Sequence, residues 1–267
     1  WNDSLSQNND TAYNLFYDVY TVVVKDNKGC SDSLDVAVSN LNSPAFQNTY
    51  EGDLNDLARG VVELSGGGFA VAGFSESFGA GGTDAYLVVT DKNGNFMWAK
   101  TYGGSLDDAA NSVQQTSDGG FILAGYTLSY GAGSYDVYLV KTDNNGNVQW
   151  SQTYGGTGDD RAYAIAKTSG GGYIIAGGTN SFGAGNTDAY LIQVDANGAV
   201  QWTKAFGGTG FDYGYSVQQT SDGGYIVAGY TYSFGAGNSD IYLIKTNAAG
   251  SSQWTKVIGG SKNDVAW

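Results

Sequence analysis

The chain of 267 residues contains no histidine and a single proline, cysteine and methionine. Without histidine it can form no Ser-His or Cys-His nucleophile pair and no histidine-ligated zinc site. The single Cys30 fits either a reduced compartment or a disulfide to a partner outside this sequence. The composition therefore excludes the commonest nucleophilic and zinc-dependent enzymes and leaves the redox compartment open.

Positive charge and long apolar runs are also scarce. Lysine and arginine number 12 against 26 aspartates and glutamates, which gives a formal net charge of −14. This charge would repel a phosphate backbone, so we expect no nucleic-acid partner. No apolar run approaches the roughly 20 residues that a membrane-spanning helix needs, so we expect no membrane insertion. The sequence shows no signal peptide, and its ends resemble those of a piece cut from a longer polypeptide.

Glycine and tyrosine are abundant instead, with 42 and 20 copies, and apolar residues do not follow a helical spacing over any long stretch. Loops rich in Gly, Asn, Asp and Ser favour tight turns, because these residues supply positive φ angles and hydrogen bonds from side chain to backbone. The composition predicts an all-β chain that is long enough to bury a core.

The sequence repeats with a period of 52 residues, which is the spacing of Trp98, Trp150, Trp202 and Trp254. Full units run over residues 49–100, 101–152, 153–204 and 205–256, and a partial fifth covers 257–267. Fixed periods of this length are typical of propellers, solenoids and arrays.

One unit contains four strand candidates, at residues 110–116, 121–127, 136–142 and 147–154. Four antiparallel strands per unit indicate a β-propeller, since a solenoid coil needs fewer strands and a shorter period. The recurring tryptophans are predicted to pack between neighbouring blades and to dock each blade on the next. We expect the propeller domain to cover residues 43–267, to open with a lone outer strand at 43–50, and to form an open arc of four blades belonging to a larger propeller.

Two motifs recur in these units with few changes: Gly-Gly-(Tyr/Phe)-Ile-x-Ala-Gly and Ser-(Phe/Tyr)-Gly-Ala-Gly-x-x-Asp. Over residues 45–267 the chain resembles the bacterial β-propeller repeats of the SBBP or delta-60 kind. Those repeats occur in secreted and surface proteins. The resemblance implies a β-propeller fold and an extracellular or cell-surface location.

Residues 1–42 do not share the repeat. Alternating residues at 20–25 and 34–39 predict two strands, and Leu15 followed by Tyr20 has the spacing of a tyrosine corner. Together with Trp1 and the segment 27–30, these residues resemble the C-terminal half of the SprB-type or PKD-like Ig repeats of bacterial surface adhesins. Such repeats often carry a second cysteine where this chain has Phe16. We expect a partial Ig-like β-sandwich whose disulfide is in question.

The turn between the third and fourth strands has oxygen-bearing residues at alternate positions, as in Asp91-x-Asn93-x-Asn95 and its copy at 143–147. This spacing is similar to the start of a calcium loop. The copy at 247–251 loses the charge, whereas a glycine is kept in every copy. We therefore expect a structural turn and no cofactor, with Ca²⁺ as the weaker alternative.

Two loops on one face of the predicted propeller hold the candidate ligand-binding residues. The loop from the fourth strand into the next unit carries an aspartate in every copy, and the loop between the second and third strands carries an aromatic residue. The aspartates either ring a central channel or cap their own loops, and capping is favoured. The aromatic residues either form a sugar or peptide platform or pack on their own blade, and packing is favoured. These candidates are Asp56, Asp108, Asp160, Asp212, Phe78, Tyr130, Phe182 and Phe234, with Asp264 as a fifth aspartate.

From these patterns we expect a non-enzymatic scaffold or binding module of a large bacterial surface or secreted protein, used in adhesion or in binding a protein or glycan. Its other partners would be further domains of the same polypeptide. A carbohydrate-binding module, or a non-catalytic part of a secreted hydrolase or lyase, stays open as an alternative. No enzyme is expected, because every notable residue recurs in each unit whereas active sites are usually single.

Overall fold

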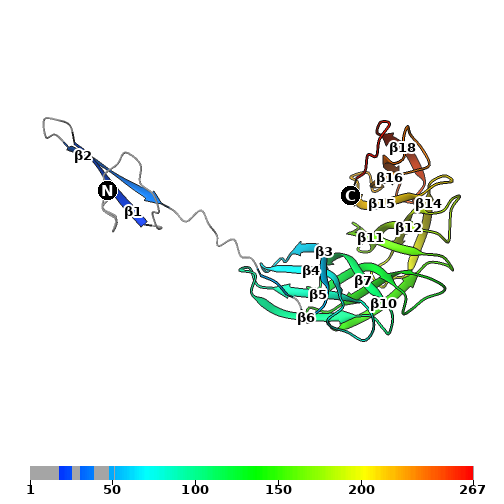
Figure 1. The fold of residues 1–267 in the computed structure, drawn as a ribbon, viewed down its shortest axis with the longest axis horizontal. Helices are drawn as coiled ribbons and strands as arrows, with labels where there is room; N and C mark the ends of the chain where they lie inside the picture. The colour runs from blue at the N-terminus through cyan, green and yellow to red at the C-terminus, as the bar shows by residue number, and fades with distance from the viewer. Residues whose placement is uncertain (1–17, 26–30, 39–47, 51, 267) are drawn as a thin grey trace. The chain divides into compact units, whose positions relative to one another are not determined.

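The computed structural model describes residues 18–25, 31–38, 48–50 and 52–266 of the chain. The chain divides into two compact units, Trp1–Gln47 and Asn48–Trp267. Regular structure in the described residues consists of β-strands without a helix (Figure 1). No helix that is long and apolar enough to cross a membrane is therefore found among them.

The first unit contains an antiparallel pair of strands, β1 (Asp18–Lys25) and β2 (Ser31–Val38). Their register pairs Asp18 with Val38 and Lys25 with Ser31. Two strands at these places agree with the alternating sequence pattern. Cys30, Leu15 and Trp1 lie outside the described residues, so the Ig-like assignment stays a prediction.

The second unit consists of four antiparallel four-stranded sheets, one for each sequence repeat, which we call blades 1 to 4 (Figure 1). The strands of each blade pair in the order in which they occur in the sequence. Blade 1 contains β3 (Asp56–Glu63), β4 (Phe69–Ser75), β5 (Asp84–Thr90) and β6 (Phe96–Tyr102). Blade 2 contains β7 (Asp108–Gln115), β8 (Phe121–Thr127), β9 (Asp136–Thr142) and β10 (Val148–Tyr154).

Blade 3 contains β11 (Asp160–Lys167), β12 (Tyr173–Thr179), β13 (Asp188–Val194) and β14 (Val200–Phe206). Blade 4 contains β15 (Asp212–Gln219), β16 (Tyr225–Thr231), β17 (Asp240–Thr246) and β18 (Ser252–Ile258). The first strands of successive blades contact one another, whereas the fourth strands contact mainly the third strand of their own blade. The first strands are therefore the innermost strands of the arrangement.

The hydrophobic cores lie between blades rather than within one. Blade 1 supplies Leu87 and Val89 to a core that is completed by Leu123 and Val140 of blade 2, and the same pattern recurs at the next two boundaries. A central strand such as β9 is consequently buried along its whole length. This explains why the second and third strands are apolar on both faces.

Trp98, Trp150 and Trp202 lie at these boundaries, where each packs against the core shared with the next blade. An added Cβ on Gly198 would lie 3.0 Å from the Trp150 ring, so the turn of blade 3 lies directly against that ring. Gly198 also has a φ of 83°, which favours glycine in this turn. Trp254, which no later blade of the described residues covers, is 42% exposed.

Part of the expected lone strand at the start of the repeat domain lies outside the described residues, and residues 48–50 belong to no strand. The Tyr50 hydroxyl nevertheless donates to the Gly94 carbonyl of blade 1. Tyr102 and Tyr154 make the equivalent bond to the next blade, with O···O distances of 2.9 and 2.7 Å. Tyr50 therefore holds blade 1 as a preceding blade would.

Every innermost strand contains a β-bulge, and every bulge faces a glycine. In blade 2 the register shifts between Ala110 and Ser112, opposite Gly125. A Cβ on Gly125 would lie 1.8 Å from the Ala109 carbonyl oxygen, which no side chain can tolerate. The recurring glycine is thus required by the close backbone approach at the bulge.

The blade contacts predict different costs for removing two equivalent tryptophans. Trp150→Ala is expected to lower the free energy of unfolding by about 3 kcal/mol, because the ring fills the boundary between blades 2 and 3. Trp254→Ala, the matched control on the uncovered blade, should cost less than about 1 kcal/mol. Urea unfolding of both variants measures this difference, and equal losses would contradict docking by the ring.

Candidate functional site

An aspartate is the first residue of each innermost strand; Asp108, Asp160 and Asp212 are buried there, whereas Asp56 of blade 1 is partly exposed. Asp108 is 0% exposed, and its Oδ2 accepts hydrogen bonds from Gly104 N and Ser129 Oγ, both at 2.7 Å. The copies Asp56, Asp160 and Asp212 accept the equivalent pair of bonds. Each carboxylate thus ties two loops of its blade together. These bonds are the loop-capping role that the sequence favoured for the aspartates.

A second buried aspartate begins the third strand of each blade and faces the first kind across the blade boundary. A Cβ on Gly103 would lie 2.2 Å from Asp84 Oδ1 and 2.5 Å from Asp108 Oδ2, so the two carboxylates flank this glycine. The same arrangement recurs for Asp136 with Asp160. Burial raises the pKa of Asp136; the hydrogen bond from Ala132 N opposes this rise, and the Asp160 charge adds to it. Each of these blade boundaries therefore holds two like-charged carboxylates close together.

The aromatic residues of the loop between the second and third strands pack on their own blades and remain half-exposed. Tyr130 lies beside Tyr138, with ring centroids 5.7 Å apart, and its hydroxyl donates to the Gly103 carbonyl. Phe78, Phe182 and Phe234 lie in the same way against Tyr86, Tyr190 and Tyr242. The four rings are 43–46% exposed. The four aromatic residues therefore pack on their own blades, as one alternative predicted, and also keep the exposed surface that the other alternative requires.

In the turn that is similar to the start of a calcium loop, the side-chain oxygens accept hydrogen bonds from the turn itself. Asp91 Oδ1 accepts from the backbone N–H groups of Asn93 and Asn95, and its Oδ2 accepts from the Asn95 amide. Asn247, the uncharged copy, accepts the equivalent backbone bonds. In the part of the chain that the structure describes, no three acidic or cysteine side chains form a group that could hold a metal ion.

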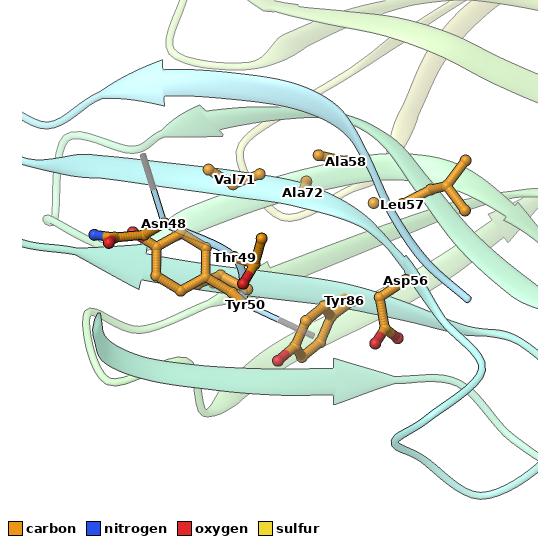
Figure 2. A pocket seen from close by; sticks show the side chains of 11 residues that line it. Asn48, Thr49, Tyr50, Asp56, Leu57, Ala58, Val71, Ala72 and Tyr86 are labelled. Atoms are coloured by element: carbon orange, nitrogen blue, oxygen red, sulfur yellow. The ribbon is translucent and has the colours of Figure 1, made fainter. Parts of the chain in front are cut away.

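A cavity of about 220 Å³ lies on the open face of blade 1 (Figure 2). Tyr50 and Tyr86 lie beside it, and Val71 and Val88 belong to its lining. The positions equivalent to Val71 and Val88 in blade 2 are Leu123 and Val140, which are buried against blade 1. The cavity therefore lies on a face whose equivalent in blade 2 is used for blade packing.

The residue at each bulge of the innermost strands differs from blade to blade: it is Arg59, Asn111, Tyr163 or Tyr215. Successive members of this set make contacts along the inner side of the blades. Arg59 Nη1 donates to Asn111 Oδ1 at 2.6 Å, and the Tyr163 and Tyr215 rings stack with centroids 4.4 Å apart. We call this surface, with the adjoining ends of the second strands, the inner face.

Both arginines of the chain lie on the inner face. The Arg161 guanidinium lies 3.9 Å from the Tyr135 ring centroid and 4.8 Å from that of Tyr126, and Arg59 lies 5.9 Å from the Tyr126 centroid. Such cation–π contacts hold long side chains in fixed places. Asp159 Oδ2 lies 3.4 Å from Arg161 Nη2, so the groups form a local charge pair.

A groove of about 320 Å³ opens in the inner face between blades 3 and 4. Its lining is Asp159, Arg161, Tyr163, Gly178, Asn180, Thr187, Phe211 and Tyr213. Gly178 stands where the other blades have Phe74, Tyr126 and Tyr230. A Cβ on Gly178 would lie 2.9 Å from the Tyr213 ring, so the glycine allows this ring to pack closely against β12 beside the groove.

Aromatic rings gather on the blade 4 side of this groove. Tyr213 lies 5.2 Å from Tyr230, measured between ring centroids, and Phe211 lies 6.3 Å from Tyr232. Phe211 and Tyr232 remain 43% and 47% exposed. Burial raises the pKa of Tyr163 to about 12, so its hydroxyl keeps its proton at neutral pH. The groove thus combines rings, hydroxyls, an amide and a charge pair.

These residues depart from the repeat, which explains why a search for recurring motifs misses them. Position 211 is Asp107 and Asp159 in the two preceding units, and position 178 is aromatic in the other three. Aligning the four units and marking the positions that change would have found both. That these positions line one groove could not be found in this way, because it depends on the β-bulges and on the order of the blades in the structure.

Two known proteins are distantly similar to the chain. No family model matches the chain. Regulatory protein FlaEY of Caulobacter vibrioides is 25% identical over 233 residues, and the match covers 77% of this chain but 24% of that protein. The crystal structure of a eukaryotic initiation factor is similar at a TM-score of 0.43 and 13% identity, over 92% of this chain and 53% of that one. The chain thus spans about a quarter of FlaEY.

The buried loop aspartates predict a clear stability cost. Asp108→Ala leaves the Gly104 N–H and the Ser129 hydroxyl without their acceptor and should lower the free energy of unfolding by about 2 kcal/mol. Asp108→Asn keeps one acceptor oxygen and should cost less. Chemical denaturation compares the two, and a neutral Asp108→Ala would show that the loops do not depend on this carboxylate.

The aspartate pairs predict a pH dependence of opposite sign to that of a salt bridge. The folded pKa of Asp136 is raised, so the wild-type chain gains stability at this site as pH falls through that pKa. Asp136→Asn is neutral at every pH and should be more stable than wild type at neutral pH. This advantage should shrink toward about pH 4, near the ordinary pKa of an aspartate. Paired unfolding curves test the trend, and an advantage that grows on acidification would refute it.

Proposed function

We propose that the chain is a non-enzymatic binding module that holds its ligand in the groove between blades 3 and 4. The observation that carries this proposal is the convergence of the non-repeated residues on that groove. Blade construction accounts for the residues that recur, whereas Gly178, Phe211 and Tyr213 have no equivalent role in the other blades. Aromatic walls with a few convergent polar groups are typical of ligand sites.

The four blades form, in this proposal, part of a β-propeller preceded by an Ig-like module. One support is that the two end blades expose faces that match the buried ones. Val61 on the open face of blade 1 is 66% exposed, whereas its equivalent in blade 2, Val113, is 2% exposed. The open faces of blades 1 and 4 would be covered if further blades followed the same packing.

A scaffold role at the bacterial surface or in a secreted protein completes the proposal. It rests on the resemblance of residues 45–267 to repeats of such proteins. Protein and glycan ligands both fit a surface used for adhesion, while the net charge of −14 disfavours nucleic acid.

A matched pair of variants tests the binding role. Gly178→Tyr restores the aromatic residue of the other blades and should fill the groove, whereas Asn144→Tyr adds the same side chain at an exposed turn of blade 2. The labelled wild-type chain is applied to an array that carries both glycans and peptides. We expect a bound class that Gly178→Tyr weakens by about tenfold or more and Asn144→Tyr leaves unchanged.

Two results would reject this function. One is an array on which the wild-type chain binds neither class, and the other is binding that Gly178→Tyr and Asn144→Tyr affect equally. Because Gly178→Tyr also pushes on Tyr213, its fold is checked by thermal unfolding. If it does not fold, Asn180→Trp at the exposed rim replaces it as the blocking variant.

A further inference from the structure

We propose that the ligand of the groove between blades 3 and 4 is a neutral saccharide. This inference rests on the proposed binding function and names the chemistry of the ligand. It follows from three properties of the groove: the kind of walls it has, the balance of its charges, and the shape of the strand edge along it.

The walls are aromatic rings that present both an apolar surface and hydroxyl groups. Phe211 lines the groove and is 43% exposed. Tyr163 and Tyr213 also line the groove, and their ring centroids lie 6.2 Å apart. A sugar ring has one apolar C–H face and a polar periphery, so it can lie against a ring and hydrogen-bond at its edges. A volume of about 320 Å³ is at the small end of ligand sites and suits a ligand of one or two rings.

The polar groups offer donors and acceptors in a nearly neutral setting. Asp159 and Arg161 supply an acceptor and a donor whose charges compensate each other. Asn180 Oδ1 accepts a hydrogen bond from Thr187 Oγ1 at 2.7 Å, which leaves its amide nitrogen as a donor at the exposed rim. Vicinal hydroxyls of a sugar both donate and accept, so they match this set. A carboxylate or phosphate ligand would instead meet Asp159.

The strand edge along the groove disfavours an extended peptide. A peptide that adds to a sheet needs a regular row of free backbone groups on an edge strand. β11, the edge strand here, changes register between Ala162 and Ala164, and β15 changes between Gly214 and Ser216. Bulges of this kind twist an edge away from pairing. The backbone therefore provides no continuous template, and the side chains carry the recognition.

Isothermal titration of the whole chain with defined oligosaccharides tests the proposal. The neutral probes are hexasaccharides of glucose, mannose, xylose and galactose in their common linkages, and the anionic probe is an oligogalacturonide. We expect a neutral probe to bind with a dissociation constant that changes less than about twofold between about 0.01 and 0.15 M salt, because no ion pair forms with the ligand.

Two substitutions at equivalent positions show whether the groove is responsible. Asp159→Asn should weaken the neutral probe by about tenfold, because a charge-assisted hydrogen bond to a sugar hydroxyl is lost. Asp107→Asn changes the same position in the preceding unit, outside the groove lining, and should leave the affinity unchanged. Tyr163→Phe, which removes a hydroxyl from the lining and keeps its ring, should weaken the probe by a smaller factor.

The possible failures are distinguishable. If no saccharide binds but a peptide does, and Gly178→Tyr abolishes that binding, the binding function holds and the saccharide inference is overturned. Binding confined to the oligogalacturonide and lost at higher salt would overturn the neutral character. Equal effects of Asp159→Asn and Asp107→Asn would place the saccharide outside the groove. If the chain binds neither glycans nor peptides, the binding function is rejected as well.

Discussion

The close approach of backbone at the bulge of each innermost strand is the constraint on which the blade depends. At Gly125 an added Cβ would lie 1.8 Å from the Ala109 carbonyl oxygen, and the equivalent contact at Gly73, Gly177 and Gly229 is as short. The glycine lets the bulge form, and the bulge gives the innermost strand one extra residue. That extra residue varies between blades. Of neighbouring positions in a single strand, one is therefore fixed by blade construction and the other is variable.

The division explains how much the sequence alone could predict. The 52-residue period and the alternation within one unit predicted four strands per unit, and the structure has four four-stranded sheets. The innermost strand begins at Asp108 rather than at residue 110, because its first residue is an aspartate that the sequence assigned to a loop. Asp108 is buried there by two hydrogen bonds that join loops far apart in the sequence. A local sequence pattern does not predict which loops such hydrogen bonds join.

The groove could not be predicted, because its residues come from strands and loops of two blades. Asp159 and Asn180 belong to loops of blade 3, whereas Phe211 directly precedes the first strand of blade 4 and Tyr213 is its second residue. Recurrence identified the loop aspartates and the loop aromatic residues. The structure shows that the aspartates accept hydrogen bonds from their own loops and that the aromatic rings pack on their own blades. The informative signal was the opposite one, a change at a position that is otherwise constant. Gly178 among three aromatic residues is the clearest case.

The placement of the variable residue at a bulge has a consequence for how such a chain can evolve. A duplicated unit carries its own glycine, tryptophan and loop aspartate, so it arrives with everything it needs to stack. Its bulge residue contacts the bulge residue of a neighbouring blade and differs in chemistry from blade to blade. Duplication followed by a few substitutions then changes the chemistry of the inner face, while the residues that build the blade stay in place. Arg59, Asn111, Tyr163 and Tyr215 fit such a history, since they share one position and differ in chemistry.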